Sequence, residues 1–142
     1  MEEKLTILRD GYGVSESDVV GYSPLTLAYI GDAVYELLIR TMVVTSANAP
    51  VNKLHKKSSL LAKAPAQSAM AEALLTAFTE EELAVYKRGR NAHSYTKAKN
   101  ATTGDYRRAT GFEAVFGYLY LKGDMKRIDE LFQMAVESTK HK

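Results

Sequence analysis

The chain has 142 residues, no cysteine and a formal net charge of only +2. This length fits one domain that buries a core without covalent cross-links, and the missing cysteines exclude disulfides, zinc–thiolate sites and cysteine nucleophiles. No apolar run approaches the roughly 18 residues that a membrane-spanning helix needs, and the N-terminus is acidic where a secretory signal would be basic. We therefore expect a cytoplasmic protein with no membrane partner.

Every periodic segment has helical spacing, and none has the alternation of a strand. Ser23 followed by Pro24 is typical of a helix start, and Thr79 with Glu82 three residues later forms a capping box. Pro65 marks a break between two neighbouring helices. These signals predict helices over about 24–44, 50–63, 66–78, 79–91, 105–122 and 124–138. We therefore predict a single all-α domain, 1–142, of about six or seven helices.

The positive charge is concentrated in one segment. From residue 87 to residue 108, seven cations against one acid give a net charge of +6, so the remainder carries −4. Between 92 and 104 this segment lacks periodicity and is rich in Ser, Thr, Asn and Lys, which predicts an exposed loop able to track phosphates. Charge runs are usually plain solvated surface, but this asymmetry favours nucleic acid. The candidate nucleic-acid-binding residues are Lys53, Lys56, Lys57, Arg88, Arg90, Asn91, His93, Lys97, Lys99, Arg107 and Arg108.

Two carboxylates, Asp32 and Glu113, occupy positions where the helical pattern calls for apolar residues. Each shares its helix with a glycine, Gly31 or Gly117, and glycine within a helix costs up to about 1 kcal/mol relative to alanine. A close helix crossing explains both glycines and would bring both carboxylates within reach of one ion. Oxygen ligands without histidine or cysteine favour Mg²⁺, or Mn²⁺ as a substitute, over zinc. For either acid alone, half-exposure or an arginine partner remains the alternative.

Other catalytic chemistries find little support. None of the three histidines has an aspartate partner or a metal-ligand spacing, and no phosphate-binding glycine loop or nucleophile elbow is present. We interpret Glu36, one turn after Asp32, as a salt-bridge or outer-shell residue, and Tyr106 as a core aromatic rather than a partner of Glu113. What remains is metal-assisted hydrolysis of a phosphodiester.

Two motifs give the chain a family resemblance. The segment 27–34, Leu-Ala-Tyr-Ile-Gly-Asp-Ala-Val, resembles the signature helix of ribonuclease III, Leu-Glu-Phe-Leu-Gly-Asp followed by a small and an aliphatic residue. The segment 110–117, Thr-Gly-Phe-Glu-Ala-Val-Phe-Gly, is similar to the family's second acidic motif, Asp-x-x-Glu-Ala-x-x-Gly. The resemblance spans most of the chain. It implies an all-helical endonuclease that cleaves double-stranded RNA, with Asp32 and Glu113 as catalytic and metal-binding residues.

The sequence departs from the ribonuclease III pattern in two ways, and these departures indicate a particular subgroup of the family. The family's first glutamate is Ala28 here, and the aspartate of its second motif is Thr110, which leaves the number of metal ions open. The sequence also ends at Lys142, so we expect no separate double-stranded-RNA-binding domain of the kind that ribonuclease III usually carries. This combination resembles the Mini-III ribonucleases. It implies maturation of large-subunit ribosomal RNA precursors, with 5′-phosphate and 3′-hydroxyl ends.

The same resemblance implies a homodimer, for which the apolar helix from Pro24 leaves surface, and it is compatible with association with a ribosomal protein. The rival hypothesis is a non-catalytic helical module that binds structured RNA or a ribonucleoprotein, since two family acids are missing. A protein–protein adaptor explains neither the basic segment nor the paired acids.

Overall fold

The computed structural model describes residues 8–92 and 102–140. These ranges contain helices and no strand, which confirms the all-α prediction. The helices are α2 (Glu16–Gly21), α3 (Pro24–Ser46), α4 (Val51–Ala62), α5 (Ala64–Leu74), α6 (Glu80–Asn91), α7 (Thr103–Lys122) and α8 (Met125–Thr139). Among the helices so described, none is both long and apolar enough to cross a bilayer.

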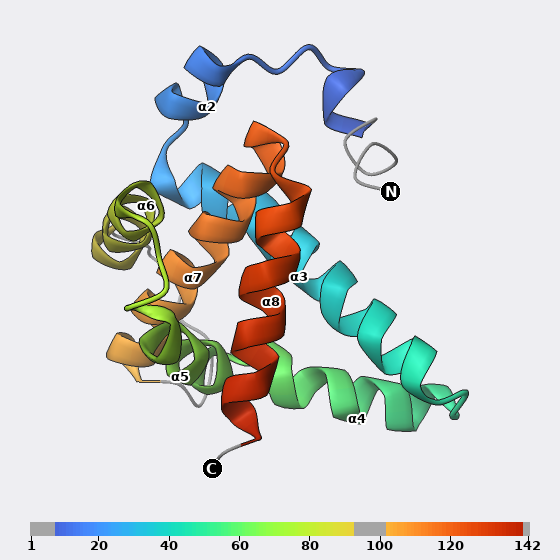
Figure 1. Ribbon diagram of the computed structural model, residues 1–142. Coiled ribbons are helices and arrows are strands. Elements are labelled where there is room, and N and C mark those ends of the chain that lie inside the picture. The colour runs from blue at the N-terminus through green and yellow to red at the C-terminus, as the bar shows by residue number, and fades with distance from the viewer. Residues whose placement is uncertain (1–7, 93–101, 141–142) are drawn as a thin grey trace.

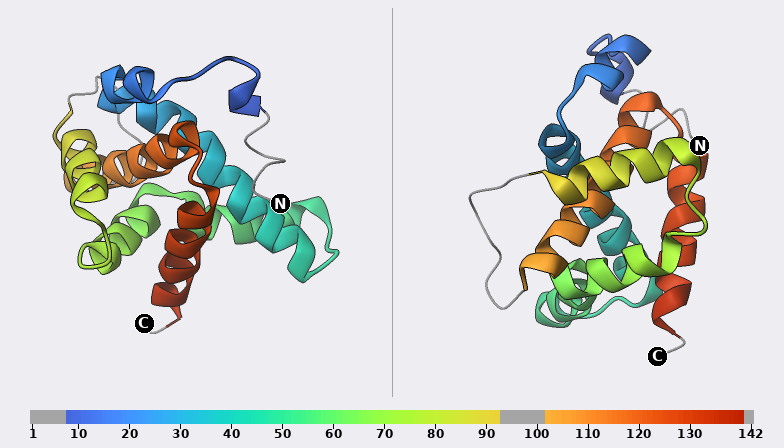
Figure 2. Two further views of the ribbon diagram at one scale, coloured as in Figure 1. Left: turned by 45° about the horizontal axis from the view of Figure 1, so that its top comes forward. Right: turned by 90° about the vertical axis from the view of Figure 1, so that its left-hand side faces the viewer.

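Helix α7 is the centre of the fold. It makes its most extensive contacts with α3, α6 and α5, and Figure 1 shows these helices and α8 arranged around it. Figure 2 shows α6 running beside α7. Ten residues of α7 are buried, among them Phe112 and Phe116, and their rings meet Tyr35 of α3 at centroid distances of 5.2 and 5.6 Å. This aromatic cluster fixes α3 against α7, the two helices that carry the candidate acids.

Most helix ends agree with the sequence signals because the capping contacts are local. Thr79 and Glu82 form the expected capping box of α6, and α3 begins at Pro24 after Ser23, whose hydroxyl accepts from the amide of Thr26 at 3.1 Å. Helix α7 begins two residues earlier than predicted, and α5 ends four residues earlier. The six-residue α2 was not predicted, although Ser15 and Asp18 form a capping box there.

The crossing of α3 and α7 depends on two glycines. A Cβ atom on Gly31 would lie 1.7 Å from the carbonyl oxygen of Glu113, and a Cβ atom on Gly117 would lie 1.9 Å from the carbonyl oxygen of Leu27. Neither helix can therefore carry a side chain at its contact point without moving away from the other. The close crossing predicted from these glycines is confirmed.

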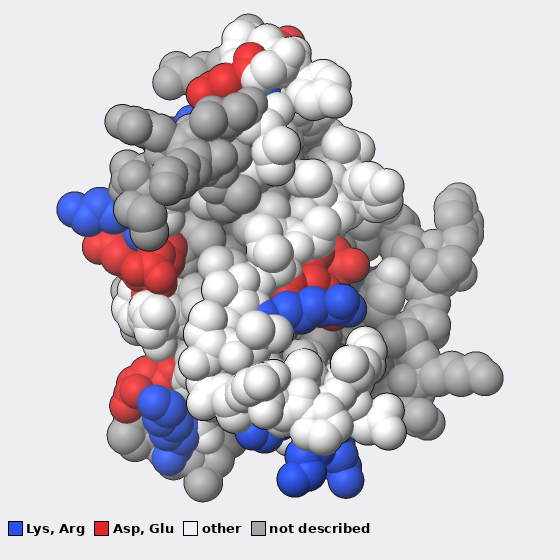
Figure 3. Space-filling view, turned by 90° about the vertical axis from the view of Figure 1, so that its right-hand side faces the viewer, with Lys and Arg blue, Asp and Glu red and all other residues white. Residues whose placement is uncertain are grey.

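One side of α3 remains uncovered within the chain. The exposed fractions of Leu25, Tyr29, Leu37 and Val44 are 38%, 83%, 52% and 56%. Figure 3, viewed from the side toward which α3 and α4 extend, shows a broad uncharged surface interrupted by a compact group of acidic and basic side chains. The described residues therefore bury one side of α3 and leave on the other side large apolar side chains beside the Glu36–Arg40 pair.

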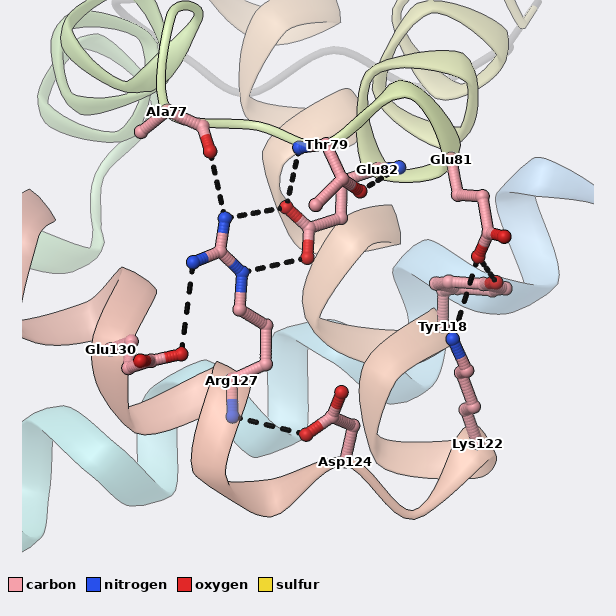
Figure 4. Close-up of polar contacts among 9 residues, drawn as sticks. All are labelled: Ala77, Thr79, Glu81, Glu82, Tyr118, Lys122, Asp124, Arg127 and Glu130. Atoms are coloured by element: carbon pink, nitrogen blue, oxygen red, sulfur yellow. Dashed lines mark hydrogen bonds and ion pairs between the residues drawn. The ribbon is translucent and has the colours of Figure 1, made fainter.

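A buried ion pair connects the start of α6 to α8 (Figure 4). The Arg127 guanidinium contacts the Glu82 carboxylate at 2.8 Å and donates to the carbonyl oxygen of Ala77 at 2.7 Å. The Glu82 side chain is only 4% exposed. Burial raises the pKa of Glu82, but hydrogen bonds from Arg127 and the Thr79 amide outweigh it and leave this pKa below its usual value.

Candidate active site

Asp32 of α3 and Glu113 of α7 line the same pocket. Its walls also include Tyr29, Ala28 and Tyr106, and are completed by Leu25, Ile30 and Ala33. The two carboxyl groups come from helices that approach to backbone contact at Gly31, the residue next to Asp32. The two acids selected from the sequence, 81 positions apart, therefore lie together at one site.

The structure corrects one expectation about Asp32. The residue is exposed, whereas the helical pattern placed it on a buried apolar face. Of the apolar residues that surround Asp32 on the helical projection, Ala28, Tyr35, Ile39 and Val43 are buried, but Leu25 is exposed, so the apolar pattern around Asp32 extends beyond the buried side of α3. Glu113 is half-buried, so only this acid is largely withdrawn from water within one chain.

The surroundings of Glu113 favour its neutral form. Burial raises the pKa of Glu113 to about 9, and the adjacent Asp32 carboxyl adds to the rise through a hydrogen bond and its negative charge. A hydrogen bond from Gln67 acts in the opposite direction. A cation that binds both carboxyl groups would displace the proton of Glu113.

Gln67 of α5 is a site residue that sequence reasoning missed. Its side chain is buried, with 3% exposed, and its Nε2 donates to Glu113 Oε2 at 3.3 Å. A signal existed: Gln67 shares the buried stripe of α5 with Met70, Ala71 and Leu74, so it is a polar residue in a core position.

Two neighbours of the acids have different roles. Glu36 accepts from the Arg40 guanidinium at 3.2 Å, which agrees with its interpretation as a salt-bridge residue. Tyr106 is half-buried and lines the pocket beside Glu113. Tyr106 belongs neither to the hydrophobic core nor to the residues packed against it, so its interpretation as a core aromatic was wrong.

The basic candidates form two exposed groups. Lys53, Lys56 and Lys57 are exposed on α4 at positions spaced three and four residues apart, so they share one side of that helix. Near the end of α6, Arg88 and Asn91 are exposed. The Arg90 guanidinium lies 5.8 Å from the ring centroid of Tyr86 and its Nε donates to Asn91 Oδ1.

The remaining cations lie around the start of α7. Arg107 is exposed. Arg108 donates to the hydroxyl of Ser68 at 2.7 Å and pairs with Asp105 at 3.3 Å and Glu72 at 3.6 Å, so its charge is balanced within the chain. The other three candidates, which fall outside the described residues, are His93, Lys97 and Lys99.

Comparison with known families decides the classification. A family model for the Ribonuclease III domain matches residues 25–124, which include both acids and the whole α3–α7 crossing. The chain belongs to the ribonuclease III family. As a ribonuclease III domain it is an endoribonuclease, and its substrate is RNA.

The relatives of this ribonuclease III domain are small proteins. The chain is 47% identical over 127 residues to Mini-ribonuclease 3 of Clostridium tetani, covering 89% of this chain and 84% of that protein. It is 44% identical over 124 residues to Mini-ribonuclease 3 of a Thermoanaerobacter species, covering 87% of each. A crystal structure of a Fusobacterium nucleatum protein is similar at a TM-score of 0.77 and 28% identity, covering 82% of this chain and 95% of that chain.

The ribonuclease III domain has no acid at two positions of its motifs. Ala28 lines the pocket with a methyl group. Thr110 is 8% exposed, and its hydroxyl donates to the carbonyl oxygen of Tyr106 at 3.0 Å, one turn earlier in α7. Neither side chain supplies a carboxylate, so the anionic donors at this pocket are Asp32 and Glu113.

Proposed function

We propose that this protein is a Mg²⁺-dependent endonuclease that cleaves double-stranded RNA, with Asp32 and Glu113 as its catalytic carboxylates. The observation that carries the proposal is their meeting at one pocket from two helices in backbone contact. The family resemblance supports the specificity for double-stranded RNA.

The residues present fit Mg²⁺. Across the described ranges, no group of three or more His, Cys, Asp or Glu side chains could form a metal site made by protein alone. Mg²⁺ is commonly held by one or two carboxylates, with water and substrate phosphate completing its octahedron. When bound, Mg²⁺ would supply Lewis-acid polarisation of the scissile phosphate and a lowered pKa for its water ligands. Mn²⁺ has the same preference for oxygen ligands and would substitute.

The protein's own contribution is charge and orientation. Asp32 approaches the pocket from the exposed side of α3, and Glu113 approaches from the half-buried side of α7. Both must be ionised to hold a divalent cation, so Glu113 has to release the proton that its surroundings favour. Cleavage on the 3′-oxygen side of the phosphate would leave 5′-phosphate and 3′-hydroxyl ends.

RNA would be held by the chain's own basic surface. Lys53, Lys56 and Lys57 on α4 are suitable for backbone phosphates because they are exposed and project from one side of a helix. Arg88 and Arg107 extend the positive surface. Following the resemblance to Mini-III ribonucleases, we propose a precursor of large-subunit ribosomal RNA as the natural substrate, in the cytoplasm, with a ribosomal protein as an additional partner.

We also propose that the protein acts as a homodimer through the uncovered side of α3. Leu25, Tyr29 and Leu37 form an exposed apolar strip along this helix. Double-stranded RNA has an approximate twofold axis that relates its strands, so a twofold dimer would place one active site on each strand. Tyr29 belongs both to this strip and to the pocket wall, which would put the active site at the edge of the interface.

The test is cleavage of a long RNA duplex by the parent protein in Mg²⁺, in chelator, and by Glu113→Gln in Mg²⁺. We expect cleavage only in the first reaction, with duplex binding retained by the variant and 5′-phosphates on the products. Glu36→Gln is the matched control, because it removes a carboxylate one turn from Asp32 that pairs with Arg40. Intact duplex in every reaction at high protein concentration would instead support a non-catalytic RNA-binding module.

A further inference from the structure

Gln67 joins two groups that are distant in the sequence. Its Nε2 atom donates to the carbonyl oxygen of Ala62 at 2.7 Å, at the last residue of α4, and to Oε2 of Glu113 at 3.3 Å. The side chain is 97% buried. The amide therefore connects the end of α4 to the carboxylate of α7 inside the protein.

The orientation of this amide is fixed by its neighbours. The Ala62 carbonyl oxygen can only accept, so the nitrogen of the amide must face it and the oxygen cannot. The second N–H of the same nitrogen is then available to Glu113. Exchanging the amide nitrogen and oxygen would place two acceptors against each other at Ala62, so the Gln67–Glu113 bond follows from the Gln67–Ala62 bond.

Packing alone does not favour a glutamine at this position. The Gln67 Oε1 atom is buried and has no hydrogen-bond donor among the described residues, and such an atom costs roughly 1–3 kcal/mol. An apolar side chain of the same shape, such as methionine, would avoid this cost. The remaining difference between the two side chains is the pair of bonds made by Nε2, one of which reaches Glu113.

We propose that Gln67 is a positioning residue that sets the orientation of the Glu113 carboxylate toward Asp32. The last torsion of a glutamate side chain is broad, so a carboxylate without this donor would be less restricted in its rotation. By holding Oε2, the amide restricts that rotation. This inference rests on the proposed function, in which Glu113 and Asp32 bind one divalent cation.

The expected consequence is weaker metal binding without a general loss of structure. Partners of metal-binding side chains are typically worth 10- to 100-fold in metal affinity. We expect Gln67→Met to weaken Mn²⁺ binding about 10-fold, measured by calorimetry on the whole protein. In a metal-free crystal structure of Gln67→Met, we expect the Glu113 carboxylate to be rotated or disordered. The melting temperature of this variant should stay within roughly 4 °C of the parent.

Tyr35→Phe is the matched control. The Tyr35 hydroxyl donates to the carbonyl oxygen of Leu61 at 2.8 Å, next to Ala62 in the same turn of α4. This variant therefore loosens the same helix end but leaves the Gln67–Glu113 bond intact. We expect Mn²⁺ affinity within twofold of the parent. Equal weakening in both variants would overturn the proposal in favour of a general effect of α4.

The crystal structure separates this proposal from the proposed function. If the Glu113 carboxylate has the same orientation in Gln67→Met as in the parent, the positioning role is overturned, even if the Mn²⁺ affinity changes. If the parent and Glu113→Gln bind Mn²⁺ equally, the metal site fails, yet a rotated Glu113 would still support the role of Gln67 in orienting it. Should Gln67→Met not fold, Gln67→Asn applies the same test, because its shorter amide cannot span Ala62 and Glu113.

Discussion

Glu113 is a carboxyl group whose charged form is disfavoured at neutral pH. Its pKa is raised from 4.5 to about 9, mainly by burial and then by the Asp32 carboxyl. Between these two values the folded chain keeps a proton on Glu113 that the unfolded chain releases. The folded state therefore binds more protons over this interval, and its stability must fall as the pH rises.

We expect the free energy of unfolding of the metal-free protein to fall by roughly 3 kcal/mol from Glu113 alone between pH 6 and pH 8.5. Glu113→Gln has no titrating group at position 113. Its free energy of unfolding should therefore fall by that much less over the same pH range. Denaturant unfolding in chelator at several pH values measures both. Glu36→Gln removes only the smallest of the contributions to the raised pKa of Glu113, so as the control it should stay close to the parent. Parallel pH profiles for parent and Glu113→Gln would contradict the raised pKa.

Arg107 and Arg108 are neighbours in the sequence but differ in their surroundings. Arg107 is exposed, while Arg108 is engaged by Ser68, Asp105 and Glu72. A cation that is already paired within the protein releases few counterions when RNA binds. The two residues therefore separate a role in RNA binding from a role in packing.

We expect Arg107→Ala to reduce the slope of log affinity against log salt concentration for an RNA duplex by about 1. Arg108→Ala should leave the slope near that of the parent and lower the melting temperature instead, because it removes the tie between α5 and the start of α7. Filter binding at several salt concentrations and thermal melts provide the two measurements. A larger change of slope for Arg108→Ala than for Arg107→Ala would reverse this assignment.

At the scale of helices, the α3–α7 crossing determines where the acids lie. The carbonyl oxygens of Glu113 and Leu27 occupy the space that side chains at Gly31 and Gly117 would need. Because those obstacles are backbone atoms within helices, they cannot rotate away. The helices would have to separate, which would disturb the core and move Asp32 relative to Glu113.

We expect Gly31→Ala and Gly117→Ala each to destabilise the protein by about 3 kcal/mol or more, as overpacked cores do. Gly21→Ala is the control, since a Cβ atom there would meet nothing within 4 Å, and it should be neutral or slightly stabilising. Chemical denaturation compares the three. If Gly31→Ala were as stable as Gly21→Ala, the helices would not cross as closely as described.

The sequence predicted what depends on local chemistry or on spacing along one helix. Capping residues such as Thr79 and Glu82 define helix ends within a few residues. The two glycines, each on the same helix as one of the acids, predicted the α3–α7 crossing. The early end of α5 was not predictable in this way, because the turn after Leu74 presents the Ala77 carbonyl to Arg127, 50 residues later.

The same limit applies to the site. Asp32 and Glu113 were found because each interrupts an apolar pattern. That pattern could not tell a surface buried in the core from one left uncovered, so it did not decide between the buried and the exposed alternative for Asp32. Gln67 was missed because its role depends on contacts with Ala62 and Glu113, which periodicity on α5 does not reveal.

For the whole molecule, the uncovered side of α3 links oligomeric state to the proposed activity. Tyr29 is 83% exposed and lines the pocket that holds Asp32. Exposed apolar side chains gathered along one side of a helix mark a candidate protein–protein contact. If a second copy covers it, the two pockets lie on either side of the interface, and each strand of a duplex meets one of them.

Tyr29→Asp should therefore convert a dimer into a monomer, because it places an unpaired charge in the interface. Tyr12→Asp is the matched control, since Tyr12 is equally exposed, at 89%, but does not lie on α3. Sedimentation should give about twice the chain mass of 15.7 kDa for the parent and the control, and the single mass for Tyr29→Asp.

Leu37→Asp, one to two turns beyond Asp32 and outside the pocket, should also dissociate the dimer. Because Leu37→Asp leaves the pocket intact, any loss of cleavage of both RNA strands in this variant would show that this cleavage needs the dimer. Tenfold higher protein concentration should restore part of that cleavage by mass action. A parent that sediments at 15.7 kDa while cutting both strands would show that one chain suffices, and the apolar strip of α3 would then require another partner.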